Sequence, residues 1–459
     1  MTATTRTPTD KLADARTTTG QQGSIGAVVA GSLAVGLLAA LLLVAAPFIP
    51  AGESEVIGAV LCGLGLGWAV VAVLSVRFTD QPQRWVMAPA MFLGVGGVLL
   101  LIFGSPVQAV LNWIWPPALL ALVAWMIVRS RRQLQGRARR LLLYPVLAML
   151  ALASVGGGWE TVSESADAQA YPMPGQLIDV GGHRLHLSCT GTGSPTVVLE
   201  PGAGGTSSDL GWIAPAVAHD TRVCVYDRAG RGWSEPADTP QDATQIATDL
   251  HTLLHRGNVP GPYVLAGHSF GGLYALTFAA RYPDEVAGMV LVDSTAPAPP
   301  ATPEPGAAPD AGSGDVMGGV SALVSTSARL GLGRLLALTD YASLPPRSRG
   351  EARAHAATSL QIRSTINEYI QGGPSVAEAA SLHDLTDKPL IVLTAGSGGG
   401  AGWSEKQNVL AELSTNSAHR VVDGATHASM VSDQQHAAAT TQAIVDVVSS
   451  VRTARPLAK

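Results

Sequence analysis

Charged side chains are scarce in this chain of 459 residues, and several motifs are missing. Asp, Glu, Lys and Arg make up 14% of the sequence, where a typical soluble domain has roughly 25%, so an ordinary soluble composition is excluded. The sequence has no His-Glu-x-x-His motif, no Cys-x-x-Cys motif and no phosphate-binding loop. We therefore predict no metal and no cofactor. The net charge is −5, and basic residues are not concentrated outside the loops between the apolar segments of the first third of the chain. Both observations argue against a nucleic-acid partner.

The apolar residues that replace the missing charges lie mainly in the first third of the chain. Five apolar segments there each come close to the roughly 20 residues that cross a bilayer. We predict a cytoplasmic tail over residues 1–24 and a membrane domain with five transmembrane helices over residues 25–158. Gly63 and Gly67 form a Gly-x-x-x-Gly pattern, which is either a helix-packing site or incidental in a glycine-rich chain. The five segments are Ile25 to Ala46, Val56 to Val76, Trp85 to Phe103, Val107 to Val128 and Leu141 to Gly158.

The basic residues around these segments predict their orientation. Lysine and arginine precede the first segment and occupy the loops after the second and the fourth, whereas residues 47–55 and 104–106 contain neither. Because cytoplasmic loops are enriched in basic residues, the N-terminus is expected in the cytoplasm. An odd number of spans then places everything after Glu160 on the outer face of the cell membrane.

The remainder of the chain has the pattern of one large α/β domain. Residues 159–175 lack periodicity and are interpreted as a linker. A hairpin near residue 176 is followed by predicted strands near residues 196, 221, 263, 288, 389 and 419, most of them separated by helical patterns. The boundaries that we predict are a first core part at 176–293, a helical cap or lid at 294–388 and a second core part at 389–459.

One of these strands ends in a sequence that suggests a nucleophile. The apolar run from Tyr263 continues into Gly267-His268-Ser269-Phe270-Gly271 and then into a helical pattern. A Gly-x-Ser-x-Gly sequence between a strand and a helix is typical of a nucleophile elbow, in which a sharp turn exposes the serine hydroxyl. Ser269 is therefore the candidate nucleophile.

Two motifs together resemble the α/β-hydrolase superfamily, in its serine-hydrolase branch. They are the Tyr-Asp-Arg-x-Gly-x-Gly-x-Ser turn at 226–234 and the Gly-His-Ser-Phe-Gly-Gly elbow at 267–272. The resemblance implies a mostly parallel eight-stranded sheet with helices on both faces and a helical cap, here preceded by an all-α transmembrane domain. A serine at the elbow, rather than an aspartate, argues against an epoxide hydrolase or a dehalogenase.

The same resemblance points to the partners of Ser269. The general base comes last in the chain order of these hydrolases, and His427 follows the final strand in a loop similar to the family's terminal Gly-x-x-His; His419 and His436 are fallback candidates. The commonest position of the acid, after the strand near residue 389, holds no carboxylate until Glu405. Asp293, at the end of the preceding strand, is therefore ranked first and Glu405 second.

Backbone N–H groups are expected to form the oxyanion hole. Phe270, which follows the nucleophile, supplies one donor, and Ala203 in the glycine-rich loop after the strand near residue 196 supplies the other. Asp227 and Arg228 are interpreted as structural residues that fix a loop under the site. Cys189 and Cys224 would lie on neighbouring strands of such a sheet, as a disulfide or as two buried thiols; a disulfide would indicate an oxidising compartment.

Three functions remain open on the sequence alone. The first is a membrane-anchored serine hydrolase that cleaves an ester or related acyl bond in a small-molecule or lipid substrate. The second is an acyltransferase to a lipid or cell-wall alcohol with the same residues. The third is a membrane sensor that keeps the hydrolase fold as a ligand pocket. The sequence does not determine the oligomeric state.

Overall fold

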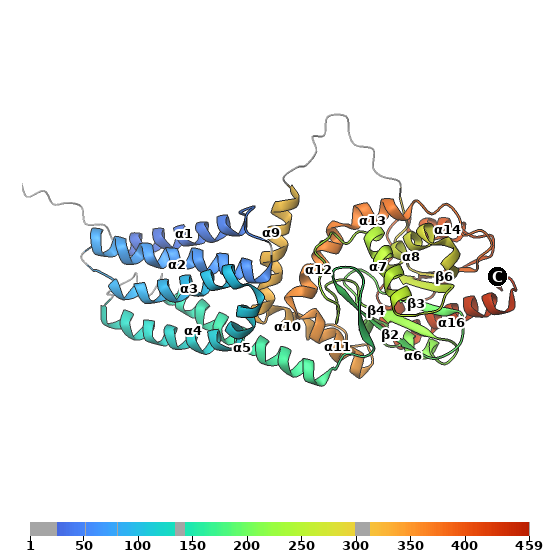
Figure 1. The fold of residues 1–459 in the computed structure, drawn as a ribbon, viewed down its shortest axis with the longest axis horizontal. Helices are drawn as coiled ribbons and strands as arrows, with labels where there is room; N and C mark the ends of the chain where they lie inside the picture. The colour runs from blue at the N-terminus through green and yellow to red at the C-terminus, as the bar shows by residue number, and fades with distance from the viewer. Residues whose placement is uncertain (1–24, 51, 80, 134–142, 299–312, 459) are drawn as a thin grey trace, which may run out of the picture. The chain divides into compact units, whose positions relative to one another are not determined.

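A computed structural model describes residues 25–50, 52–79, 81–133, 143–298 and 313–458 (Figure 1). The predicted tail at 1–24 lies outside these residues. The chain divides into two compact units, residues 1–155 and residues 156–459. The first unit is helical, and the second contains a β-sheet with helices around it.

Within the described residues, five helices are long and apolar enough to cross a membrane. The predicted all-α segment with five apolar helices is therefore confirmed. A short 3₁₀ helix, Arg84–Val86, precedes the third of them. The five are α1 (Ile25–Val44), α2 (Glu53–Phe78), α3 (Met87–Phe103), α4 (Ser105–Gln133) and α5 (Tyr144–Ala170).

Small residues let α1 and α2 pack closely. A Cβ atom added to Gly63 would lie 2.3 Å from the backbone nitrogen of Ala40, and one added to Gly67 would lie 3.0 Å from the Cα atom of Gly36. Neither position on α2 has room for a side chain. The Gly-x-x-x-Gly pattern is thus a packing surface, as it is in many membrane helices.

Helix α5 corrects the predicted linker. It continues to Ala170, so most of residues 159–175 is helical and not an irregular linker. The acidic residues that suggested a linker are paired: Glu160 lies 3.1 Å from Arg334 and Glu164 lies 2.6 Å from Arg329. These ion pairs stabilise a polar helix that has little apolar periodicity of its own.

The second unit contains an eight-stranded sheet in the order β1-β2-β4-β3-β5-β6-β7-β8. The pairs β1–β2 and β2–β4 are antiparallel, and all other neighbours are parallel, so the predicted mostly parallel sheet is confirmed. The strands are β1 (Gln176–Asp179), β2 (Arg184–Thr190), β3 (Thr196–Glu200), β4 (Val223–Tyr226), β5 (Tyr263–His268), β6 (Val286–Val292), β7 (Leu390–Ala395) and β8 (Ser417–Val422).

Both faces of the sheet are covered by helices (Figure 1). Successive residues of a strand point to opposite faces: Val198 packs with α7 (Ala243–Arg256) and α8 (Phe270–Arg281) in one core, and Val197 packs with α6 (Ile213–Val217) and α16 (Gln434–Thr453) in the other. Such burial on both faces explains why the central strands are continuous apolar runs.

Helices of a cap lie between β6 and β7 in the chain. Those within the described residues are α9 (Ser313–Thr326), α10 (Leu332–Ala337), α11 (Pro346–Ala356), α12 (Ser359–Ile370) and α13 (Gly372–Ala379), with a 3₁₀ helix at Ser327–Leu330. Two more helices, α14 (Trp403–Ala411) and α15 (Ser429–Ser432), follow β7 and β8.

Candidate active site

Ser269 occupies a sharp turn between β5 and α8. Its φ is +54° and its ψ is −121°; a positive φ is uncommon for a residue other than glycine and often occurs at functional sites. The turn is possible because of the flanking glycines: a Cβ atom on Gly267 would lie 2.5 Å from the Gly271 carbonyl oxygen, and one on Gly271 would lie 2.4 Å from the Glu200 carbonyl oxygen. The sequence Gly-x-Ser-x-Gly thus places the serine at the carboxyl end of the sheet.

Asp293 follows β6 and contacts His427. Its Oδ2 lies 2.6 Å from His427 Nδ1, and its Oδ1 accepts hydrogen bonds from Trp403 Nε1 at 2.8 Å and Ala395 N at 3.1 Å. Burial alone would raise the pKa of Asp293, but the hydrogen bonds from His427, Trp403 and Ala395 outweigh it and lower the pKa. The carboxylate therefore stays ionised and can orient an imidazole.

His427 lies in the loop between β8 and α15, next to the elbow. Its carbonyl oxygen accepts a hydrogen bond from His268 Nε2 at 2.9 Å, and the two imidazole rings are 4.6 Å apart. Burial first, and the nearby His427 second, lower the pKa of His268 to about 4, so His268 is neutral and serves as a fixed hydrogen-bond donor. This bond joins the loop of the candidate base to the residue before Ser269.

The alternative candidates lie elsewhere. Glu405 is on α14 with an exposed side chain. His419, on β8, is bonded to Thr394 Oγ1 at 2.7 Å and to Asn408 Oδ1 at 2.7 Å. His436 lies near Asp433, at the start of α16. Of the ranked candidates, the structure brings Asp293 and His427 together.

The loop after β3 lies against the elbow. A Cβ atom on Gly202 would lie 3.2 Å from Ser269 Cβ. Arg228 donates hydrogen bonds to the carbonyl oxygens of Pro201 at 2.9 Å and Gly202 at 2.7 Å. In a trans peptide the N–H points opposite to the C=O, so the Ala203 N–H points away from Arg228. Arg228 thus orients the peptide of one candidate oxyanion donor without being a reacting group.

Glu368, on cap helix α12, is a residue that the sequence analysis missed. Its buried carboxylate accepts hydrogen bonds from Gly204 N at 2.8 Å and Tyr274 Oη at 2.8 Å, and it is ion-paired with both Arg228 and Arg231. Burial raises the pKa of Glu368, yet the two arginines lower it overall. The sequence contains one signal for such a residue. Arg228 and Arg231 lie in one turn, and two buried arginines require a carboxylate from another part of the chain.

Asp227 has a structural environment. It accepts a hydrogen bond from Ser207 N at 2.7 Å, and its Oδ2 lies 2.8 Å from Nδ1 of the equally buried His186. Burial raises the pKa of Asp227, and the bond with His186 lowers it overall. A Cβ atom on Gly232 would lie 2.3 Å from the Asp227 carboxylate, which explains the glycine in this turn.

Glu200 is a second buried carboxylate under the candidate oxyanion loop. Tyr226 Oη donates a hydrogen bond to its Oε1 at 2.6 Å, and its Oε2 lies 3.6 Å from Arg228 Nη1. Burial raises the pKa of Glu200 to about 7, against the lowering effects of Arg228 and Tyr226. Glu200 is thus a titratable group between the sheet and the loop.

Three potential metal ligands meet away from this site. His251 and His255 lie one helical turn apart on α7, and Glu285 Oε1 is 3.1 Å from a ring nitrogen of each. The ligand atoms lie within 4.8 Å of one another. The distances are also those of hydrogen bonds among the three groups, so the cluster has partners without an ion.

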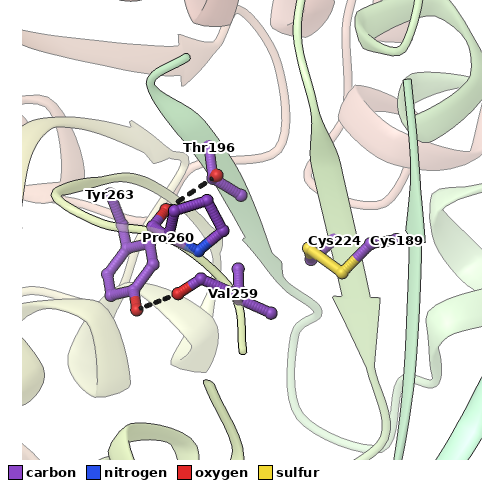
Figure 2. The surroundings of a disulfide bond; sticks show 6 residues. All are labelled: Cys189, Thr196, Cys224, Val259, Pro260 and Tyr263. Carbon is purple, nitrogen blue, oxygen red and sulfur yellow. Dashed lines mark hydrogen bonds between the residues drawn. A yellow bond between two sulfur atoms is a disulfide. The ribbon is translucent and has the colours of Figure 1, made fainter. Parts of the chain in front are cut away.

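Figure 2 shows the bond between Cys189 on β2 and Cys224 on β4. The two cysteines are directly paired in the antiparallel register of these strands. The loop near β5 is fixed nearby by hydrogen bonds from Thr196 Oγ1 to Pro260 O and from Tyr263 Oη to Val259 O, each 2.9 Å long (Figure 2).

Comparisons with known proteins agree with this fold. The sequence profile of the alpha/beta hydrolase fold matches residues 195–434. An uncharacterized protein of Schizosaccharomyces pombe is 37% identical over 155 residues, which is 27% of this chain and 29% of that protein. An uncharacterized vacuolar membrane protein of Saccharomyces cerevisiae is 28% identical over 130 residues, 24% of this chain and 20% of that protein. An esterase from Thermogutta terrifontis is similar in structure, with 22% identity, a TM-score of 0.45, and coverage of 60% of this chain and 99% of the esterase.

The chain spans less than half the length of the curated relatives named here. The profile match covers more than half of the chain and includes the elbow, the cap and the loop of His427. With its apolar N-terminal helices and its eight-stranded sheet, the chain belongs to the alpha/beta hydrolase fold family.

Proposed function

We propose that the protein is a membrane-anchored serine hydrolase that cleaves an ester or a related acyl bond. The observation that carries this proposal is the Asp293–His427 contact of 2.6 Å, placed beside the turn that bears Ser269. A nucleophile, a base and an acid at the carboxyl end of one sheet are the parts that acyl transfer through a covalent intermediate requires.

In this mechanism Ser269 Oγ attacks the carbonyl carbon of the substrate while His427 accepts the hydroxyl proton. The acyl–oxygen bond then breaks, and the imidazolium returns its proton to the leaving alcohol. Water, activated by the same imidazole, attacks the acyl-enzyme and releases the acid and free Ser269. Asp293 stays ionised and stabilises the imidazolium through Nδ1.

The N–H groups of Ala203 and Phe270 would stabilise the negative charge on the substrate oxygen. Such donors act best when they are fixed before the reaction. Support for the first donor comes from the two hydrogen bonds by which Arg228 holds its loop. Support for the second comes from its position at the first residue of α8, directly after Ser269.

The hydrolase unit would lie on the outer face of the cell membrane, with the N-terminus in the cytoplasm. The arginine-rich loop after α4 and Arg77 and Arg84 between α2 and α3 support this orientation by the positive-inside rule. The Cys189–Cys224 bond also supports it, because disulfides persist in oxidising compartments.

A direct test uses the full chain, solubilised in detergent, with a series of p-nitrophenyl esters. We expect hydrolysis by the native protein and a loss of at least about 10³-fold in kcat for Ser269→Ala, since removal of a nucleophile leaves only binding and oxyanion effects. Ser449→Ala, at an exposed position on α16, is the control and should retain activity. Equal rates for native protein and Ser269→Ala would refute the proposal.

A further inference from the structure

The cap segment from Val320 to Leu338 has its apolar side chains on the outside. Small residues face inward: Ser321, Ala322, Ser325, Ala328 and Ala337 are all buried. The large aliphatic side chains of the same segment are exposed. They are Val320, Leu323, Val324, Leu330, Leu332, Leu335, Leu336 and Leu338, with exposed fractions between 37% and 73%.

This pattern is the reverse of a soluble helix, which buries its leucines and exposes its polar residues. Small residues inside and aliphatic residues outside are instead typical of helices that face lipid, where packing depends on close approach of the backbones. Eight exposed aliphatic side chains within residues 320–338 are also more than the single apolar residues that are scattered over an ordinary protein surface.

The charges of the segment are neutralised. Its two charged residues are Arg329 and Arg334, and both form ion pairs with the C-terminal half of α5. Arg329 lies 2.6 Å from Glu164, and Arg334 lies 3.1 Å from Glu160 and 2.6 Å from Asp167. Paired charges of this kind cost far less to place near hydrocarbon than single ones.

Two close contacts also hold the segment against α5. A Cβ atom on Gly156 of α5 would lie 2.2 Å from the Leu330 carbonyl oxygen, and one on Gly331 would lie 2.9 Å from the Trp159 ring. The apolar run of α5 ends here, at Trp159 and Glu160, and tryptophan is enriched at the membrane–water interface. The cap therefore joins α5 where that helix would leave the bilayer.

From these observations we infer that the cap surface formed by Val320 to Leu338 inserts into the outer leaflet, where lipid acyl chains cover it. The inference also assigns a substrate class to Ser269, and in this respect it rests on the proposed function. The substrate would be an acyl ester of a membrane lipid that enters the site laterally from the bilayer.

A connection to the elbow supports this substrate class. Helix α9 is joined to α12 by a hydrogen bond of 3.3 Å between Ser321 Oγ and Asn367 Oδ1. On α12, the exposed ring of Tyr369 lies 5.7 Å from the ring of Phe270, the residue after Ser269. Helix α12 thus contacts both α9, which carries part of the aliphatic surface, and the residue that follows the nucleophile.

The test measures lipid contact directly and does not need catalysis. Leu335→Cys and Leu336→Cys, each in the full chain with Cys62→Ser, are labelled with bimane and reconstituted in phosphatidylcholine vesicles that contain a doxyl-labelled lipid. Val409→Cys on α14 is the matched control, because Val409 is a similarly exposed aliphatic residue at 60%. Thermal midpoints of the labelled proteins verify that each is folded.

We expect several-fold stronger lipid quenching at 335 and 336 than at 409. Equal quenching at all three positions would overturn the inference. A probe at 335 and 336 with blue-shifted emission but no quenching would also overturn it, because this result would mean that protein, and not lipid, covers the surface. Activity provides a second readout: Leu335→Ser with Leu336→Ser should lower hydrolysis of a vesicle-borne long-chain ester at least tenfold and leave a short soluble ester unaffected. Loss of both activities would contradict the inference, whereas absence of activity in the native protein would refute the proposed function alone.

Discussion

Asp293 is the residue on which the proposed mechanism depends most. It lies at the end of β6 with φ of +44°, a strained conformation for a residue that is not glycine. Three hydrogen bonds hold its carboxylate, one of them to His427. A strained residue whose two carboxylate oxygens are both hydrogen-bonded is expected to have a specific role, and the role that we propose is to orient the base.

Replacement of this carboxylate should therefore abolish most of the activity. We expect Asp293→Asn to lower kcat by about 10³- to 10⁴-fold, as is typical when the acid of a triad becomes an amide. Glu405→Gln, the matched change at the other candidate acid, should leave kcat within about twofold of the native value. The measurement is ester hydrolysis by the solubilised full chain, and the reverse result would make Glu405 the acid.

Glu200 should make stability depend on pH. Its pKa is raised from 4.5 to about 7 in the folded state, so the folded protein holds a proton that the unfolded chain has lost over this range. The contribution is fully present below the unfolded value and is lost as the pH rises through about 7. Arg228, Tyr226 and Glu368 surround the group. In the folded state the pKa of Glu368 is lowered by the two arginines and those of Tyr226 and Arg228 are raised, so none of the three titrates inside this range.

Glu200→Gln removes this titration. The difference in Tm, variant minus native, should therefore increase between pH 5 and pH 8, measured on the full chain in detergent. A difference that is the same at both pH values would mean that Glu200 is ionised throughout, with its charge compensated by Arg228.

At the scale of elements, α12 and the loop after β3 form one unit through Glu368. A single carboxylate from the cap accepts a hydrogen bond from Gly204 N and forms ion pairs with two arginines from the turn after β4. The position of the cap and the shape of the candidate oxyanion loop are therefore coupled.

Glu368→Gln should be strongly destabilising. It removes the carboxylate that pairs with both Arg228 and Arg231, and breaking a buried ion pair in this way costs about 3 to 5 kcal/mol. The control is Glu378→Gln on α13, because Glu378 accepts a hydrogen bond from Thr244 N at 2.8 Å and the change should cost about 1 kcal/mol. Thermal unfolding of both variants checks the prediction, and equal Tm values would contradict it.

The elements that the sequence predicted well have local signals. The strands near residues 196, 263 and 389 were located within a few residues, because apolar β-branched runs end there at proline or glycine. The sharp turn at Ser269 between β5 and α8 also has a local signal, because the glycines that permit it adjoin the serine. Asp293 was ranked first by its place at a strand end, and the structure puts its carboxylate beside His427.

What the sequence did not predict depends on distant partners. The extension of α5 to Ala170 is stabilised by Arg329 and Arg334, more than 160 residues away in the chain. The role of Glu368 requires the turn after β4 to be in place. The inverted burial of the cap segment is not visible in composition, because the same leucines would suit a soluble core.

The whole molecule combines five apolar helices with an alpha/beta hydrolase fold in which a disulfide joins β2 and β4. The helices alone would serve for anchoring, and the hydrolase alone would act in any compartment. The Cys189–Cys224 bond supports the proposed position of this domain outside the cytoplasm, because disulfides persist in oxidising compartments.

This disulfide should contribute measurably to stability. It closes a loop with a sequence separation of 35 residues, for which loop entropy gives about 4 kcal/mol. The double variant Cys189→Ala with Cys224→Ala should unfold at a lower Tm than the native protein and should be insensitive to a reducing agent. The native protein should shift to the same Tm on reduction; a native protein that a reductant does not affect would show that the thiols are unbonded.

The most direct test of the central claim is labelling of right-side-out vesicles with a membrane-impermeant fluorophosphonate, which reacts with activated serines. We expect labelling of the native protein without permeabilisation, and no labelling of Ser269→Ala or His427→Ala. Labelling only after permeabilisation would contradict the outward orientation, and no labelling under either condition would contradict the assignment of Ser269 as a working nucleophile.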